Sequence, residues 1–316
     1  MIANGFLPDA STSGAGARVA FGAEAHFDRC SFHANFGAGH GTALAVHGRA
    51  TLRDSEVFDN RQTRDGLLKI AAGTLYVAAH GRLDVDHAVI IGNMTFAGGA
   101  LLVDGPDGRA ELRRVLFHGH LSVERAGAVF VESGASVLLQ NATLHHAPIV
   151  LAGASRIDLV HVTALASGDA ALPLLAMDGS EARATLGNSA VTAPSGAAAC
   201  VAPLGNVSSR GGNVFRGAAP CALALLDSDR VVDDLRVQAV QIPAPASVMP
   251  NVGNRALAPA ADSALSDAAL DDACPLLDQV GAVRPGIVPH ISPPRCGSGA
   301  IEWPVNRLFD DGFDLR

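Results

Sequence analysis

A repeated eleven-residue pattern occupies the first two thirds of the chain and constrains its fold more than any other feature. Each segment has small or apolar residues at its first, third, sixth and eighth positions. The seven segments are AHFDRCSFHAN (25–35), ATLRDSEVFDN (50–60), LDVDHAVIIGN (83–93), AELRRVLFHGH (110–120), VLLQNATLHHA (137–147), IDLVHVTALAS (157–167) and ATLGNSAVTAP (184–194). A unit this short cannot bury its apolar face alone, so the repeat predicts stacked coils that share a continuous core.

The alternation within each segment indicates β-strands rather than helices. Apolar and polar residues alternate with period two, the phase changes at a bend, and a 3.6-residue period is absent. The third column reads Phe27, Leu52, Val85, Leu112, Leu139, Leu159 and Leu186. Charged residues such as Asp84, Glu111 and Asp158 are expected to face solvent. We therefore expect an all-β fold, a parallel solenoid of about seven coils over residues 17–195, after an N-terminal extension of residues 1–16.

Asparagines mark the end of the first three segments. The eleventh column reads Asn35, Asn60 and Asn93, followed by His120. Stacked asparagine side chains can hydrogen-bond from coil to coil, which satisfies amide groups that are costly to bury. Unrelated asparagines in surface turns are the alternative. The shared register favours the ladder.

The C-terminal third differs, because the repeat fades and Pro, Ser and Gly become frequent. Four of the five cysteines lie here. Their order predicts two local disulfides, Cys200–Cys221 and Cys274–Cys296, and leaves Cys30 as a buried thiol in an inward column. Disulfides indicate an oxidising compartment. A zinc site is the rival interpretation, although no Cys-x-x-Cys pair is present.

Composition and charge exclude several classes of protein. Apolar residues make up 48% and charged residues 17%, which excludes disorder over most of the chain. The net charge is −8 and no run of Lys or Arg is present, so no nucleic-acid partner is expected. No stretch is apolar enough over the length that a transmembrane helix needs.

The start of the chain and the cysteines point to different compartments. The first residues, MIANGFLPDASTSGAG, show no signal-peptide pattern, which by itself predicts the cytoplasm or a truncated start. The paired cysteines predict an oxidising environment. We give the cysteine pattern more weight and expect an extracellular or cell-surface location.

Two motifs near the C-terminus resemble the terminal signature of the choice-of-anchor Q domain family. They are CPLLDQVGAVRPG (274–286) and CGSGAIEW (296–303). Members of that family resemble pectin lyases in fold, which implies a right-handed parallel β-helix, and they are bacterial secreted or surface proteins that usually have no assigned activity. The resemblance implies an irregular, disulfide-closed capping region over residues 196–303 and a tail over residues 304–316.

These motifs supply three residues with a predicted structural role. Arg284 is expected to bond to a carboxylate, Asp278 or Glu302, or to backbone carbonyls, and so to fold the C-terminal loop onto the last coil. The open end of a solenoid exposes strand edges and a slice of the core, which must be covered to prevent end-to-end association. We therefore interpret the motif as a cap on the end of the helix rather than as a site.

Charged residues on the repeats offer a catalytic candidate. Asp84 and Asp86 lie on one face of a strand, and Arg53 and Arg113 occupy the column of Asp86 on the neighbouring coils. Clustered carboxylates that bind Ca²⁺ beside an arginine base would suit a polysaccharide lyase. A ladder of surface ion pairs, each worth about 0–1 kcal/mol, explains the same pattern, and we favour it.

Two histidines offer a metal candidate. His118 and His145 share an outward column on adjacent coils, where they are close enough to share a metal ion. No carboxylate or cysteine accompanies them, so we favour exposed turn histidines as the interpretation. No cofactor is expected.

The sequence as a whole predicts a secreted or surface-displayed bacterial β-helix without catalytic activity, in adhesion, display or the binding of polysaccharide or matrix components. A polysaccharide lyase or glycoside hydrolase on the same scaffold is the alternative. A catalytic groove would bring carboxylates and a base together in one concave patch. A structural rod would instead repeat its ladders evenly along its length.

Overall fold

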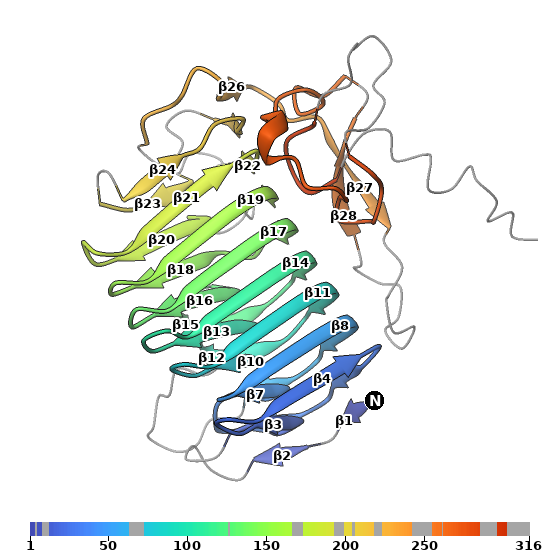
Figure 1. The fold of residues 1–316 in the computed structure, drawn as a ribbon, viewed down its shortest axis with the longest axis vertical. Helices are drawn as coiled ribbons and strands as arrows, with labels where there is room; N and C mark the ends of the chain where they lie inside the picture. Colours follow the sequence, from blue (N-terminus) through green and yellow to red (C-terminus); the bar gives the residue numbers. More distant parts are fainter. Residues whose placement is uncertain are drawn as a thin grey trace, which may run out of the picture.

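A computed structural model describes residues 1–3, 5–7, 13–62, 73–125, 127–165, 173–192, 199–203, 206–217, 223–241, 255–260, 262–284 and 296–301. The described residues form a parallel β-helix of about seven turns and contain no α-helix (Figure 1). In Figure 1 the strands of the near sheet run from left to right as the chain rises from its N-terminus, which is the sense of a right-handed coil. The predicted all-β parallel fold is confirmed.

Three parallel sheets run along the β-helix, in the order in which each coil meets them. The first sheet contains β1 (Ile2–Ala3), β4 (Glu24–Asp28), β5 (Ser31–His33), β8 (Arg49–Phe58), β11 (Arg82–Ile91), β14 (Arg109–His118), β17 (Ser136–His145), β19 (Arg156–Leu165), β21 (Arg183–Gly187), β22 (Ala190–Thr192), β24 (Val207–Ser209), β25 (Val214–Arg216) and β26 (Arg230–Val232). The second contains β2 (Phe6–Leu7), β6 (Phe36–Gly37), β9 (Arg61–Gln62), β12 (Met94–Ala97) and β15 (Leu121–Arg125). The third contains β3 (Ala17–Val19), β7 (Leu44–Val46), β10 (Leu75–Val77), β13 (Leu101–Asp104), β16 (Val129–Glu132), β18 (Ile149–Ala152), β20 (Leu175–Asp178) and β23 (Cys200–Val201).

The inward columns of the repeat fill the interior. On β11, Val85 pairs in parallel register with Leu52 of β8 and Leu112 of β14, as the alignment of segments predicts. From the second coil onward, every residue of the third column is at most 2% exposed. Stacking of identical columns therefore supplies the continuous core that one coil cannot provide.

Each repeat bends at its fifth position, and this bend causes the phase change in the sequence. The seven residues there have φ angles between +46° and +58°: Arg29, Asp54, His87, Arg114, Asn141, His161 and Asn188. Asn, Asp and His enter the left-handed region more readily than other non-glycine residues, and they fill five of these seven positions. Because the left-handed residue takes up one step of the strand, the third and sixth positions both reach the core.

The asparagine column forms a buried hydrogen-bond ladder at the turn between the first and second sheets. Asn35 Nδ2 donates to Asn60 Oδ1 at 2.8 Å, and Asn60 Nδ2 donates to Asn93 Oδ1 at 2.9 Å. All three residues are at most 1% exposed. His120 occupies the next position of the ladder and ends it. Its Nε2 donates to the carbonyl oxygen of Ile90 at 3.0 Å, in the same way that the amides of Asn60 and Asn93 donate to the carbonyls of Phe32 and Val57.

Replacing Asn60 by alanine is expected to lower the free energy of unfolding by about 2–4 kcal/mol. The change leaves buried groups of Asn35 and Asn93 without their partners, at about 1–3 kcal/mol each. Chemical denaturation followed by circular dichroism measures the loss. Arg61→Ala is the control, since the exposed Arg61 pairs with Asp59 on the surface and such pairs contribute about 0–1 kcal/mol. Equal losses for the two variants would contradict a stabilising ladder.

The coils run past both predicted boundaries. Strand β1 pairs with β5 and β2 pairs with β6, so the predicted extension of residues 1–16 contributes to the first coil. Beyond residue 195, strands β23 to β26 continue the parallel pairing as far as Val232. Strands of two or three residues are too short for their alternation to stand out in a sequence.

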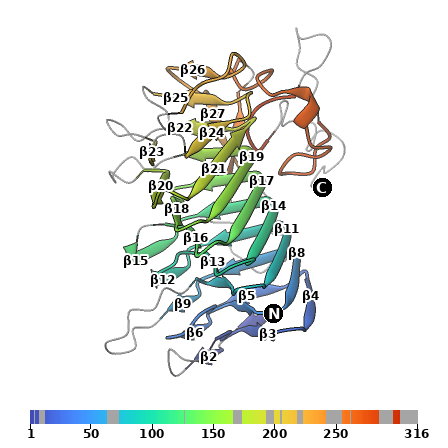
Figure 2. The same ribbon diagram turned by 60° about the vertical axis from the view of Figure 1, so that its left-hand side comes forward.

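The C-terminal region lies along the side of the β-helix rather than over its end. An antiparallel hairpin, β27 (Val237–Gln241) with β28 (Arg255–Pro259), and the 3₁₀ turn η1 (Asp271–Ala273) lead into it. Figure 2 shows this orange and red segment beside the upper strands of the first sheet. The predicted end cap is therefore wrong in its position. We call residues 255–260, 262–284 and 296–301 the C-terminal cover.

The cover packs on outward-facing residues of the first sheet that are apolar or threonine. These residues, each at most 1% exposed, are Val89, Leu116, Thr143, Thr163, Ala190 and Val214. Gln279 bridges two strands, since its Nε2 donates to the carbonyl of Val115 at 3.0 Å and its Oε1 accepts from Thr143 at 2.5 Å. Burying this outward column removes apolar surface from water, which explains why the C-terminal cover lies on the side of the β-helix.

Arg284 is buried within the cover and holds its last turn. Its guanidinium donates to the carbonyl oxygens of Gly297 at 2.9 Å and Gly299 at 2.7 Å, and it lies 3.0 Å from His161 Nδ1. Backbone carbonyls were one of the two predicted kinds of partner. Glu302 lies outside the described residues.

Asp278 is also buried, but it closes a turn of its own. Its Oδ1 accepts hydrogen bonds from the backbone N–H groups of Val280 at 3.0 Å and Ala282 at 2.8 Å. This local pattern is the turn that Asp side chains commonly form. The carboxylate thus orders the loop that brings Arg284 to its carbonyls.

The cysteines follow the predicted pairing where the structure describes them. Cys274 and Cys296 form a disulfide with a Cα–Cα distance of 6.1 Å, as predicted. Cys200 is also disulfide-bonded, and its predicted partner Cys221 lies outside the described residues. Cys30 is free, but it is partly exposed rather than buried, because within the described ranges no strand pairs with the edge of β4 opposite β8.

Candidate functional site

The charged ladder of the central coils forms, but with partners other than those predicted. Asp86 lies in register between Arg53 and Arg113. Its carboxylate instead accepts two hydrogen bonds from Arg114, at 2.8 and 2.6 Å, and Arg113 donates to Glu111 at 2.5 Å. The left-handed backbone at Arg114 turns this side chain outward over Asp86, which an alternating strand pattern does not reveal.

Glu111 forms ion pairs with the other arginines of the central coils. Its carboxylate, 8% exposed, lies 3.4 Å from Arg82, 2.6 Å from Arg109 and 2.5 Å from Arg113. Burial opposes its ionisation, but the three guanidiniums hold the pKa of Glu111 below its ordinary value. Arg82 also binds Asp84 at 2.9 Å. The acidic candidates of the central coils therefore belong to an ion-pair network.

The histidine candidates lie ring against ring instead of converging on one point. His118 and His145 are in register, with ring centroids 4.6 Å apart, and His146 lies 4.2 Å from His145. Burial, and then the neighbouring His146, lowers the pKa of both, that of His145 to about 4. Within the described ranges, no group of three or more His, Cys, Asp or Glu side chains could hold a metal ion.

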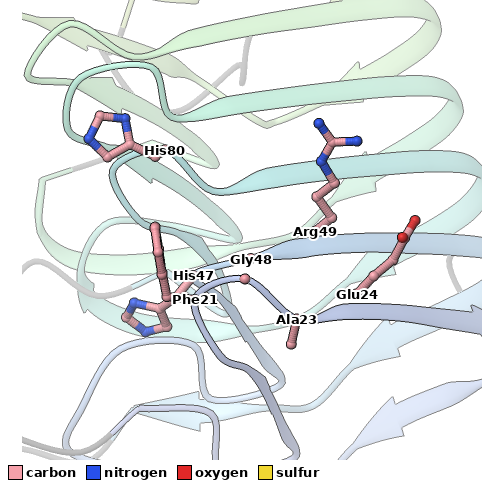
Figure 3. Close-up of a pocket in the computed structure, with 8 residues that line it drawn as sticks. Phe21, Ala23, Glu24, His47, Gly48, Arg49 and His80 are labelled. Atoms are coloured by element: carbon pink, nitrogen blue, oxygen red, sulfur yellow. The ribbon is translucent and has the colours of Figure 1, made fainter.

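The outer surface of the first two coils is hollowed in two neighbouring places. A cavity of about 390 Å³ lies where the third sheet turns into the first, and Phe21, Glu24, His47, Arg49 and His80 line it (Figure 3). A second cavity, of about 450 Å³, lies over β4 and β8 and is lined by His26, Phe27, Asp28, Thr51, Arg53 and Asp54. Because β4 and β8 carry residues of both cavities, we call the two together the N-terminal groove.

Arg49 and Arg53 are the charged donors of this groove. Both are exposed and lie four residues apart on β8, which separates their Cα atoms by about 13 Å. Neither takes part in an ion pair or a side-chain hydrogen bond within the part of the chain that the structure describes. The arginines of the next two coils, by contrast, are held by carboxylates.

Carboxylates face these arginines across the groove. The register of β4 with β8 places Glu24 opposite Arg49 and Asp28 opposite Arg53. Between these two pairs, His26 Nδ1 and Thr51 Oγ1 are hydrogen-bonded at 2.7 Å. The groove therefore alternates groups that donate hydrogen bonds with groups that accept them.

An exposed aromatic ring stands at the end of the groove. The side chain of Phe21 is 81% exposed and lies beside His47 in Figure 3. Burial, and then the charge of Arg18, lowers the pKa of His47, which favours the neutral imidazole. The ring therefore offers a flat apolar surface next to groups that form hydrogen bonds.

Of the four charged candidates from the sequence, Arg53 is the one that the structure places in the groove. Phe21, Arg49 and His47 were missed. They stand at turns and strand starts, outside the inward columns on which the sequence argument rested. The sequence held one signal for Phe21. A large apolar residue beside Gly22, in an expected turn, has no strand partner to cover it and is therefore expected to be exposed.

No protein-family model, curated protein or solved structure matches this chain. The resemblance to the choice-of-anchor Q domain family therefore stays a prediction. Among the described residues, no helix has the length and apolar character that crossing a membrane requires.

Proposed function

We propose that the protein is an extracellular or cell-surface β-helix that binds a neutral, hydroxyl-rich polysaccharide in its N-terminal groove. The observation that carries this proposal is the unpaired arginines Arg49 and Arg53 facing Glu24 and Asp28 along β4 and β8. Sugar hydroxyls both donate and accept hydrogen bonds, so a chain of sugars can use the guanidiniums as donors and the carboxylates as acceptors. Phe21 adds an apolar face for one ring.

Charge favours a neutral ligand over an acidic one. Two arginines and three carboxylates line the groove, a formal net charge of −1, and the whole chain carries −8. A polyanion would meet a repulsive field on approach. The Cys274–Cys296 disulfide supports an oxidising location for the protein.

Replacing Arg49 by alanine is expected to weaken the binding of a neutral polysaccharide about tenfold or more, since a hydrogen bond from a charged group contributes about 1.5–3 kcal/mol. Arg156→Ala is the matched control, because Arg156 is exposed in the same column of the first sheet four coils away. Affinity electrophoresis in gels that contain neutral or acidic polysaccharides measures both. Equal weakening by the two variants, or binding confined to the acidic polymers, would contradict the proposal.

One observation favours a glycoside hydrolase as a second candidate. Asp28 and Asp54 line the same cavity from neighbouring strands, and Asp54 lies 2.6 Å from His87. Hydrolases of glycosides place two carboxyl groups about 5–9.5 Å apart. Incubation with the bound polysaccharide would then release reducing ends, and Asp54→Asn would abolish the release. Unchanged polymer after prolonged incubation leaves binding alone. A product with unsaturated ends would indicate the lyase alternative.

A further inference from the structure

A hydroxyl, an imidazole and a carboxylate lie in a row within the N-terminal groove. Thr51 Oγ1 lies 2.7 Å from His26 Nδ1, and His26 Nε2 lies 3.8 Å from Glu24 Oε1. The parallel register of β4 with β8 places Thr51 directly beside His26, and Glu24 precedes His26 by two residues on the same face of β4. A nucleophile beside a base, with a third group that orients the base, is an arrangement that supports acyl transfer.

The carboxylate of Glu24 favours one tautomer of His26. In a neutral imidazole, one nitrogen donates a hydrogen bond and the other accepts one. Because a carboxylate only accepts, Glu24 favours the hydrogen on Nε2 and leaves the lone pair of Nδ1 for the hydroxyl of Thr51. The hydroxyl of Thr51 therefore donates to a base, which is the first requirement for its oxygen to act as a nucleophile.

The same column of the first sheet holds a second threonine that lacks this base. Thr185 lies five coils from Thr51, in register through the intervening strands. Its hydroxyl donates to the carboxylate of Asp158, and a carboxylate is a much weaker base than an imidazole. The two threonines share a strand position and differ in the group that accepts their proton, so Thr185 provides a matched control for Thr51.

Two arginines flank Thr51 on the outer face of β8. Arg49 precedes it and Arg53 follows it by two residues, so each Cα lies about 7 Å from that of Thr51. Figure 3 shows Arg49 and Glu24 projecting from the same side of the sheet. Neither guanidinium is held by a carboxylate of the described residues. Both can therefore donate hydrogen bonds to an oxygen on which negative charge develops, which stabilises the transition state of acyl transfer.

We propose that the N-terminal groove hydrolyses acetyl esters of sugar hydroxyls, with Thr51 as the nucleophile and His26 as the general base. Glu24 acts through His26 and is a positioning residue. The choice of an acetylated polysaccharide as the substrate rests on the proposed function, whereas the assignment of the three residues does not. An acetyl ester is uncharged, so it suits a groove whose net charge disfavours acidic ligands.

The reaction consists of two balanced steps. Thr51 Oγ1 attacks the carbonyl carbon while His26 takes its proton, the bond from that carbon to the sugar oxygen breaks, and the sugar oxygen leaves with this proton. Thr51 is then acetylated. A water molecule, deprotonated by His26, attacks the acetyl carbon, the bond to Oγ1 breaks, and Oγ1 takes the proton back as acetic acid leaves. One ester and one water thus give one alcohol and one carboxylic acid, with no change of oxidation state.

Release of p-nitrophenol from p-nitrophenyl acetate tests these residues on the full chain without a sugar. Thr51→Val, which keeps the shape of the side chain, is expected to lower kcat about a hundredfold or more, whereas Thr51→Ser keeps a hydroxyl and should retain activity. Thr185→Val should keep the wild-type rate. Mass spectrometry of an acid-quenched reaction should find the acetyl group on Thr51. Equal rates in Thr51→Val and Thr185→Val would overturn the inference, even if affinity electrophoresis shows that a polysaccharide binds.

Glu24→Gln tests the positioning role with the same aryl ester, which offers no sugar hydroxyl to Glu24. Loss of the orienting carboxylate should lower kcat about tenfold at an unchanged KM, and an unchanged kcat would contradict this role. Acetate release from an acetylated neutral polysaccharide then tests the substrate. Release that Thr51→Val abolishes supports a sugar ester. Thr51-dependent cleavage of the aryl ester alone would rule out that substrate but not the assignment of Thr51 and His26.

Discussion

Arg284→Ala is expected to lower the free energy of unfolding by about 3–5 kcal/mol, because it leaves buried acceptors without their donor. The carbonyl oxygens of Gly297 and Gly299 lose the guanidinium that joins them, and His161 loses its contact to the cover. The cover should then separate from the first sheet and expose Val89 and Leu116. Chemical denaturation measures the loss, and limited proteolysis at native conditions reports the separation.

Two further variants sharpen this prediction. Arg284→Lys keeps the charge but cannot donate to two carbonyls in the same fork geometry, so it should recover less than half of the lost stability. Arg236→Ala is the control, since Arg236 is exposed and pairs with Asp262 on the surface, where ion pairs contribute about 0–1 kcal/mol. If Arg284→Ala is as stable as this control but no longer binds polysaccharide, the motif is a site and not a structural element.

Acidification from pH 7 to pH 4 is expected to remove on the order of 5 kcal/mol of stability through two histidines, with partial solvent exposure already discounted. Burial lowers the pKa of His120 to about 3 and that of His145 to about 4. In the unfolded chain both return to about 6.5. Between these values the unfolded state binds protons that the folded state does not, so stability is complete above pH 6.5 and falls as the pH drops toward the folded pKa.

The geometry of His120 suggests the variant that tests this. Its Nε2 donates to the carbonyl of Ile90, and its Nδ1, the nitrogen that would take the proton, has no hydrogen-bond partner among the described residues. His120→Asn places an amide in the fourth position of the asparagine ladder and removes the titrating group. Denaturation curves at pH 7 and pH 4 should show similar neutral stability and a smaller acid loss.

His26→Asn provides the control, because His26 is 69% exposed on the outer face of β4. This change should leave the acid loss unaltered. An acid loss in His120→Asn as large as in the wild type would show that the buried histidine does not govern the pH dependence.

The sequence alone determined the coil, the core columns and the asparagine ladder. Each of these features recurs from repeat to repeat, so a weak match in one segment is supported by the matches in the others. The same inward position recurs from Phe27 to Leu186, and the same turn position from Asn35 to Asn93. The Cys274–Cys296 disulfide was also accessible, since two cysteines 22 residues apart close a local loop. Patterns that are local and repeated can be recognised in a sequence without knowledge of distant contacts.

Only the tertiary structure decided where the C-terminal cover lies and which charges pair. Thr143 and Gln279 meet across 136 residues, and such a contact leaves no periodic trace in either segment. The signal for the cover was the seventh position of the repeat, which changes from Ser31 and Glu56 to apolar residues and threonines. Such an outward column indicates that something covers it, but it does not indicate which segment does. Arg114 reaches Asp86 because of a left-handed backbone angle. The N-terminal groove likewise depends on side chains from β4, β8 and the preceding turns meeting in space, which only the folded coils bring about.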